Sequence, residues 1–226
     1  MISTNTPGIL FDLDGTVLDT APDIQRVINQ IREEQGLSPL PLEQVRPHVS
    51  GGSGLLATLL CDTRPSEQAL LGLKKQLLHR YQAHQCEHIV FFPGMEDLLH
   101  TLDRQNIPWG IVTNRTQALA EKAISRYPVF EKAHCVVCAD TTPHPKPHPA
   151  PLLHACTLLN IDPTHTVYIG DDSIDILAGK AAGIKKTLLV LFGYADPITA
   201  ATWGADHLFS DSNALSDWLM QHHISP

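Results

Sequence analysis

The segment GILFDLDGTVLDT, residues 8–20, changes abruptly from an apolar run to a cluster of acids. Its first five residues have the length and composition of a buried strand. Asp12, Asp14 and Asp19 follow at the strand end, and acids this close repel one another unless a cation offsets their charge. Hard divalent cations such as Mg²⁺ prefer oxygen ligands of this kind. The segment therefore favours a strand that ends at a metal site, with a plain polar turn as the alternative.

Short apolar runs alternate with helical patterns along the rest of the chain. Met95, Leu98, Leu99 and Leu102 form one helical stripe, and a second stripe spans residues 152–159. This alternation predicts an α/β fold whose parallel sheet is covered on both faces and binds ligands at the carboxyl ends of its strands. The predicted strands are residues 8–12, 108–114, 134–140, 166–171 and 186–192.

The spacing between the first two strands is large. Residues 20–90 have almost wholly helical patterns, with one apolar stripe over 24–31 and another over 70–81. Pro22 stands near the start of the first helix, Gly36 follows its end, and Ser66 precedes the second helix. We therefore expect a helical insert directly after the first strand. The turn VSGGSG, residues 49–54, is either an anion-binding loop or a plain helix connection.

Polar side chains also follow other predicted strands. Thr113 and Asn114 end one strand, and Asp171 ends another, with Asp175 one helical turn later. Lys146 lies between prolines, which restrict the backbone of its loop. Three polar strand ends and a rigidly held lysine together predict one shared site.

The sequence resembles the haloacid dehalogenase-like hydrolases. The resemblance rests on D-x-D-G-T at 12–16, Thr113, Lys146 and G-D-x-x-x-D at 170–175, in that order, and it covers nearly the whole chain. The segments FDLDGTVLDT, FPGM, KPHPAP and GDDSIDILAGKAAG are similar to the phosphoglycolate phosphatase branch. VSGGS, RYQAH, GDDSIDI and WGAD also resemble a branch that acts on N-acetylmuramic acid 6-phosphate. The resemblance implies a Rossmann-like catalytic core, residues 1–19 and 91–226, and a helical cap, residues 20–90.

The family's roles carry over to matching positions. Asp12 is implied as the nucleophile that forms an aspartyl-phosphate, and Asp14 as the acid and then the base. Thr113 and Lys146 are implied to bind the phosphoryl group. The resemblance implies a Mg²⁺ ion held by Asp12, the Asp14 backbone carbonyl and Asp171, with Asp175 as a ligand or a supporting residue.

Further contacts are expected around the leaving group. The cap is expected to exclude water and to read the leaving group. Two positions depart from the family pattern: Asp172 replaces a small hydroxyl residue, and Arg115 stands where lysine is common. Candidate substrate-binding residues are Asn114, Arg46, Ser50, Gly51, Gly52 and Ser53.

The expected activity is Mg²⁺-dependent hydrolysis of a small phosphomonoester such as phosphoglycolate. The alternatives are an N-acetylmuramic acid 6-phosphate or other sugar-phosphate phosphatase, a phosphosugar mutase, and a non-catalytic binding protein. Asp14 favours phosphoryl chemistry over dehalogenation, because a halide leaving group needs no proton.

The composition of the chain limits the kinds of partner and the cell compartment that we expect for this protein. The net charge of −8 and the pI of about 5.8 disfavour nucleic-acid binding. Residues 1–8 have no signal-peptide pattern and no apolar run suits a membrane span, so we expect a cytoplasmic protein. Five cysteines make a disulfide framework unlikely, and the pair Cys135 and Cys138 is expected in a buried strand rather than in a redox or zinc site.

Overall fold

A computed structural model of the protein describes residues 7–84 and 88–224. The chain divides into two compact units. The first unit consists of Met1–Leu18 with Phe91–Pro226, and the second unit is Asp19–Val90. The strands β2 (Leu18–Asp19) and β3 (Val90–Phe91), where the chain passes from one unit to the other, pair as a two-stranded sheet.

The first unit is built on a parallel sheet. Among the described residues, six strands follow the order β5-β4-β1-β6-β7-β8, and each neighbouring pair is parallel. All five predicted strands are confirmed, although each is shorter than expected. The sixth, β8, escaped prediction because it has three residues, two of them exposed. The strands are β1 (Gly8–Phe11), β4 (Trp109–Val112), β5 (Cys135–Val137), β6 (Thr166–Gly170), β7 (Lys186–Val190) and β8 (His207–Phe209).

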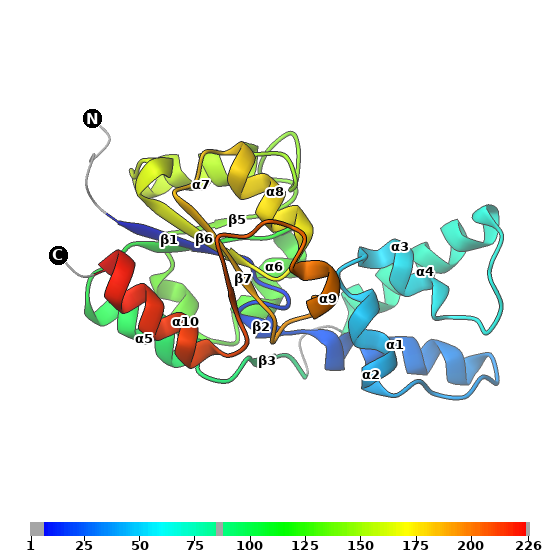
Figure 1. The fold of residues 1–226 in the computed structure, drawn as a ribbon. Helices are drawn as coiled ribbons and strands as arrows, with labels where there is room; N and C mark the ends of the chain where they lie inside the picture. Colours follow the sequence, from blue (N-terminus) through cyan, green and yellow to red (C-terminus); the bar gives the residue numbers. More distant parts are fainter. Residues whose placement is uncertain (1–6, 85–87, 225–226) are drawn as a thin grey trace. The chain divides into compact units, whose positions relative to one another are not determined.

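Helices cover both faces of this sheet. Figure 1 shows α7 (Ala150–Leu159) and α8 (Ser173–Ala181) on one side, and α5 (Met95–Arg104) and α10 (Ser212–Leu219) on the other. The predicted stripe of α5 is buried, and β1 is buried along its whole length. The core of the sheet is therefore shielded from solvent by helices, as is typical of a parallel sheet. The unit also contains α6 (Gln117–Ile124), α9 (Pro197–Ala200), the short 3₁₀ turns η2 (Pro128–Lys132) and η3 (Pro163–His165), and the π-helical turn η4 (Met220–Ile224).

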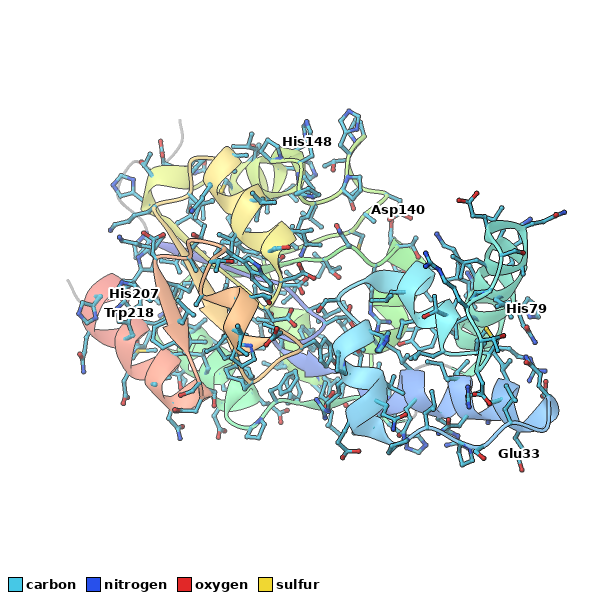
Figure 2. All side chains as sticks on the ribbon, turned by 45° about the vertical axis from the view of Figure 1, so that its right-hand side comes forward. Glu33, His79, Asp140, His148, His207 and Trp218 are labelled. Atoms are coloured by element: carbon cyan, nitrogen blue, oxygen red, sulfur yellow. The ribbon has the colours of Figure 1, made fainter. Side chains whose placement is uncertain are left out.

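The edge strand β8 contacts α10 through aromatic rings. The His207 ring on β8 lies 4.9 Å from the Trp218 ring on α10, and Figure 2 shows the two side by side. Phe209 also contacts Trp218, with ring centroids 6.1 Å apart. Phe209 is buried, whereas His207 and Leu208 stay exposed, and the edge strand is only three residues long, which limits the open backbone edge that it offers.

The second unit is helical, as the sequence predicts. The apolar stripe of α1 is buried, and Arg32 at its end is buried as well. Arg32 donates to the Ser38 and Leu59 carbonyls, at 2.7 and 2.8 Å, and to Asp62 at 2.7 Å. One guanidinium thus ties three segments of the unit together. The helices are α1 (Ala21–Glu34), α2 (Leu42–Val45), α3 (Gly52–Thr58) and α4 (Glu67–His84), with the 3₁₀ turn η1 (Arg46–His48).

The prediction that Cys135 and Cys138 are buried is confirmed, but only Cys135 lies in a strand. Cys135 in β5 and Cys138 just after it are both buried, and neither forms a disulfide. Burial raises the pKa of the Cys135 thiol to about 12 and that of Cys138 to about 11. Thiols held neutral in this way are poor nucleophiles and poor metal ligands. In the part of the chain that the structure describes, no helix combines the length and apolarity needed to cross a membrane.

Candidate active site

The acidic turn after β1 packs directly against the end of β6. The backbone amide of Asp12 donates to the Ile169 carbonyl at 2.8 Å. Gly15 has a φ of +83°, and a Cβ atom there would lie 2.0 Å from Oδ2 of Asp171. Only glycine adopts this conformation at low cost while allowing so close an approach. The D-x-D-G-T turn therefore brings two acidic strand ends together.

Lys146 lies at the centre of the site. Its Nζ atom is within hydrogen-bonding distance of Oδ1 of Asp12 and Oδ1 of Asp175, both at 2.7 Å. The Tyr168 hydroxyl lies 2.8 Å away and the Val112 carbonyl 2.9 Å away. The Lys146 side chain is only 2% exposed. A loop lysine from far along the sequence is thus buried among groups from the neighbouring strands β1, β4 and β6 and from α8.

Burial and mutual repulsion set the protonation of these groups. Burial raises the pKa of Asp12 to about 7, and the Lys146 charge opposes this shift only in part. The pKa of Asp171 also lies well above its usual value, mainly through burial and then through repulsion by Asp12 and Asp175. For Lys146, burial favours the neutral form, but the two adjacent carboxylates outweigh it and raise the pKa. The lysine is therefore charged, and the carboxyl cluster is short of positive charge.

Three carboxylates are placed to share a cation. One oxygen each from Asp12, Asp171 and Asp175 lies within 4.8 Å of the others, and all three residues are buried. Hard oxygen donors in this arrangement suit Mg²⁺, and a cation would remove the repulsion between them. The donor set therefore fits the ion expected from the sequence. Oδ2 of Asp171 also accepts a hydrogen bond from the Tyr194 amide at 2.9 Å.

Asp175 has more protein partners than the other two carboxylates. Its Oδ1 accepts from Lys146 and from the Tyr168 hydroxyl, both at 2.7 Å, and its Oδ2 accepts from the Asp172 amide at 3.1 Å. These bonds hold the lysine in place whether or not Asp175 touches a metal. Its role as a ligand stays a prediction.

Asp172, a departure from the family pattern, is explained by helix capping. Its Oδ1 accepts from the Ile174 amide at 3.1 Å, and together with Asp175 it forms a capping box at the start of α8. Carboxylates at helix N-termini are stabilising. The extra acid therefore serves the helix that presents Asp175.

The segment after β4 brings two further predicted residues, Thr113 and Asn114, to the site. The Thr113 amide donates to the Val137 carbonyl at 2.9 Å, and its hydroxyl accepts from the Arg115 amide at 3.1 Å. The Asn114 side chain donates to the Lys146 carbonyl at 2.9 Å and accepts from the Lys146 amide at 3.0 Å. Asn114 thus holds the lysine loop, a contact that its predicted substrate role does not include.

Asp14 forms an ion pair with Arg115. Nε and Nη2 of Arg115 donate to the two carboxylate oxygens of Asp14, each at 2.6 Å. The sequence marks Arg115 only as a departure from the family pattern and does not predict its partner. Tyr168 was missed as well, and the signal available was a hydroxyl within a run of buried strand residues.

The remaining predicted contacts lie in the second unit. Arg46 forms an ion pair with Asp19, which belongs to the same unit. Gly51 precedes α3 and Gly52 begins it. The role of these residues and of Ser50 and Ser53 in substrate binding stays a prediction.

Comparisons with known proteins agree with this geometry. A family model described as haloacid dehalogenase-like hydrolase matches residues 9–189. An N-acetylmuramic acid 6-phosphate phosphatase of Pseudomonas aeruginosa is 37% identical over 212 residues, which cover 93% of this chain and 93% of that protein. A phosphoglycolate phosphatase of Xanthomonas campestris pv. campestris is 37% identical over 205 residues, covering 88% of this chain and 90% of that protein.

A solved structure shares the fold. The HAD-superfamily hydrolase, subfamily IA, variant 1, of Geobacter sulfurreducens superimposes with a TM-score of 0.72 at 21% identity. The match covers 95% of this chain and 96% of that one. At this sequence identity, the structural similarity shows only that the two proteins share a fold.

Proposed function

Because this chain belongs to the haloacid dehalogenase-like hydrolase family, we propose that it is a Mg²⁺-dependent phosphatase that hydrolyses a small phosphomonoester through an aspartyl-phosphate. The observation that carries the proposal is the buried cluster in which Lys146 joins Asp12 and Asp175 beside Asp171. Such a cluster is costly for folding alone, because several buried carboxylates face a single lysine. Clusters of this kind are typical of functional sites.

Asp12 and Asp14 perform the bond-making steps in this proposal. An Asp12 carboxylate oxygen attacks phosphorus, the P–O bond to the alcohol breaks, and Asp14 gives a proton to the departing oxygen. Water then attacks the aspartyl-phosphate and gives its proton to Asp14, which releases phosphate and restores Asp12.

The neighbouring residues position the reacting groups and balance their negative charge. Lys146 neutralises one oxygen of Asp12 and stabilises negative charge on the phosphoryl group. Thr113 offers a hydroxyl at the end of the adjacent strand, and Asn114 keeps Lys146 in place. Asp12, Asp171 and the Asp14 carbonyl would hold a Mg²⁺ ion, with Asp175 nearby, and the ion would supply charge that offsets repulsion between carboxylate and phosphate.

The helical unit, Asp19–Val90, is proposed as the cap that selects the substrate. Arg46, Ser50, Gly51, Gly52 and Ser53 are its candidate contacts. Its partner would be a free small molecule rather than nucleic acid or membrane, in keeping with the net charge of −8.

Two substrates stand out. Phosphoglycolate is favoured by the motif resemblance and by the Xanthomonas relative. N-acetylmuramic acid 6-phosphate is favoured by the Pseudomonas relative, which matches as large a share of the chain at the same identity.

The test is phosphate release from both esters, with Mg²⁺ and with EDTA. We expect turnover of at least one ester that depends on Mg²⁺ and is abolished by Asp12→Asn. The matched control is Asp217→Asn, which removes the same charge from an exposed position on α10 and should leave turnover unchanged. Turnover by Asp12→Asn at the wild-type rate would remove the nucleophile assignment.

The same assay separates the alternatives. A mutase needs a bisphosphate activator and returns an isomeric sugar phosphate, so free phosphate without an activator excludes it. A non-catalytic binding protein would release no phosphate from a broad panel of esters although it binds the metal.

A further inference from the structure

Asp171 is held differently from the other two carboxylates of the buried cluster. Lys146 hydrogen-bonds those two, at 2.7 Å each, but within the described part of the chain it makes no such bond to Asp171. The described donors to Asp171 are the Tyr194 amide, 2.9 Å from Oδ2, and the Thr16 hydroxyl, 3.5 Å from Oδ1. The shorter bond comes from the loop of residues 192–194, which follows β7. This loop therefore provides the main hydrogen bond that holds the Asp171 carboxylate.

The 192–194 loop fits closely against the acidic turn after β1. A Cβ atom on Gly193 would lie 2.0 Å from the Gly15 carbonyl oxygen and 2.8 Å from Asp171. The φ of Gly193 lies outside the left-handed region, so it is this close approach that requires glycine here. In the same way, a Cβ atom on Gly15 would lie 2.7 Å from the Tyr194 ring. The loop therefore packs directly on both Asp171 and the acidic turn.

Aromatic packing holds the loop in this position. The centroid of the Phe92 ring lies 5.4 Å from that of Phe192 and 6.2 Å from that of Tyr194. Phe92 and Tyr194 are only 5% and 7% exposed, and all three rings belong to the first unit. Rings at these distances attract one another in addition to the effect of their buried area. The Tyr194 amide is thus presented to Asp171 from a firmly packed backbone.

We propose that the 192–194 loop is a positioning element that fixes the Asp171 carboxylate in the orientation in which it binds the divalent cation. The proposal rests on the proposed metal site and adds residues that lie outside the sequence motifs. The Tyr194 amide donates to a carboxylate that its acidic neighbours repel, so it keeps Asp171 in place before a cation binds. Groups that hydrogen-bond a metal ligand orient it, and their loss costs roughly 10- to 100-fold in metal affinity.

Gly193→Ala is the main test, because the new methyl group must push the loop away from Gly15 and Asp171. Binding of Mn²⁺, which takes the same oxygen ligands as Mg²⁺, is measured by EPR titration of the unbound ion. We expect the variant to bind Mn²⁺ at least about tenfold more weakly than the wild type does. Thermal unfolding in EDTA establishes that the variant is folded at the temperature of the titration.

Gly110→Ala is the matched control. Gly110 lies in β4 of the same unit, and its φ is also outside the left-handed region. A Cβ atom there would lie 2.5 Å from the Cys135 sulfur and 3.1 Å from the Cys135 carbonyl oxygen. The control thus adds the same methyl group to a buried contact with Cys135 instead of with a carboxylate, and its Mn²⁺ affinity should stay within about twofold of the wild type. An equal loss of affinity in both glycine variants would indicate general damage to the core and would overturn the proposal.

A double-mutant cycle shows whether the loop acts through Asp171. Asp171→Asn weakens Mn²⁺ binding by itself, and EPR titration to millimolar Mn²⁺ measures the binding that the other ligands still support. In this background, Gly193→Ala should change the affinity by less than about twofold, because the carboxylate that the loop positions is absent. An equal loss in both backgrounds would mean that the loop acts on the Gly15 turn instead, and the proposal would be wrong.

Phe92→Leu decides the question if Gly193→Ala does not fold. It keeps a buried apolar side chain and removes the ring that contacts Phe192 and Tyr194. We expect Mn²⁺ to bind at least about threefold more weakly, in line with the loss of two aromatic contacts that hold the loop. Phe130→Leu, which removes a similarly buried ring from a different aromatic cluster, should bind Mn²⁺ as the wild type does. Wild-type affinity in Phe92→Leu would count against the loop as a positioning element.

The wild-type titration separates this proposal from the metal site on which it rests. If the wild type binds no Mn²⁺, the metal site itself is wrong, and the role of the loop falls with it. If the wild type binds Mn²⁺ and the loop variants bind it equally well, the metal site stands and only the role of the loop is refuted.

Discussion

Replacing Lys146 by methionine tests whether the buried cluster depends on this one positive charge. Methionine has a similar length and is apolar, so the change removes the charge while largely filling the space. Asp12 and Asp175 would then face each other without the cation that now lies 2.7 Å from each. Their side chains are only 10% and 1% exposed, so water cannot replace the lysine.

The magnitude follows from this burial. Removing one partner of a buried ion pair costs about 3–5 kcal/mol, because the remaining charge is left desolvated. For a chain of this size, each kcal/mol lowers Tm by about 2–4 °C, which gives a decrease of roughly 6–20 °C. Mg²⁺ should recover part of the loss, since a bound cation replaces the missing positive charge.

Thermal unfolding in EDTA and in Mg²⁺ measures both effects. The control is Lys186→Met, which breaks the 3.0 Å pair with Asp206 on the surface, where the side chains are 40% and 32% exposed. That change should cost no more than about 1 kcal/mol. Adding Asp12→Asn to Lys146→Met should restore stability, because it removes one of the two charges left unpaired. A loss for Lys146→Met no larger than the control would refute the reasoning.

Three further outcomes are expected. The apparent affinity for Mg²⁺, measured by calorimetry, should fall about tenfold per pH unit below about pH 7. The reason is that burial raises the pKa of Asp12 to about 7, so protons compete with the metal for this carboxylate. A constant affinity from pH 8 to pH 5 would contradict this. Gly15→Ala should destabilise the protein by at least about 1 kcal/mol in urea unfolding and impair turnover, since φ is +83° and the new Cβ would meet Asp171; a wild-type midpoint would argue against strain. Burial lowers the pKa of His223 in the folded protein, so as pH falls the unfolded chain binds a proton at this residue before the folded protein does. The stability that His223 contributes is therefore complete above about pH 6.5 and is lost as pH falls through the folded-state pKa. Urea unfolding of His223→Gln should therefore depend less on pH between 7.5 and 5 than the wild type does, and parallel curves would exclude the effect.

Much of the architecture follows from local patterns. Buried strands are short apolar runs, amphipathic helices repeat every 3.6 residues, and both signals are strong in this chain. The carboxyl ends of parallel strands lie at one edge of the sheet, so the sequence alone assigns the polar residues after β1, β4 and β6 to one site. The three-residue β8 gave no such signal, because its burial depends on α10 rather than on its own pattern.

The members of the buried cluster could be predicted from the sequence for the same reason, since Asp12, Thr113 and Asp171 each directly follow a strand and Lys146 belongs to a recognisable motif. The hydrogen bonds and ion pairs that the members of this cluster form could not be predicted from the sequence. Which group a side chain meets depends on distances between segments over 100 residues apart, as in Arg115 with Asp14, and no local spacing encodes those distances.

The amino-acid order alone thus determined the class of fold and the residues gathered at one sheet edge, because strand and helix periodicity are properties of neighbouring residues. Only the tertiary structure decided that Asp172 caps a helix, that the Tyr168 hydroxyl contacts Lys146, and that Arg115 engages Asp14. Hydrogen bonds have a reach of about 3 Å, so their partners are chosen by the packed arrangement of the strands and not by position along the chain.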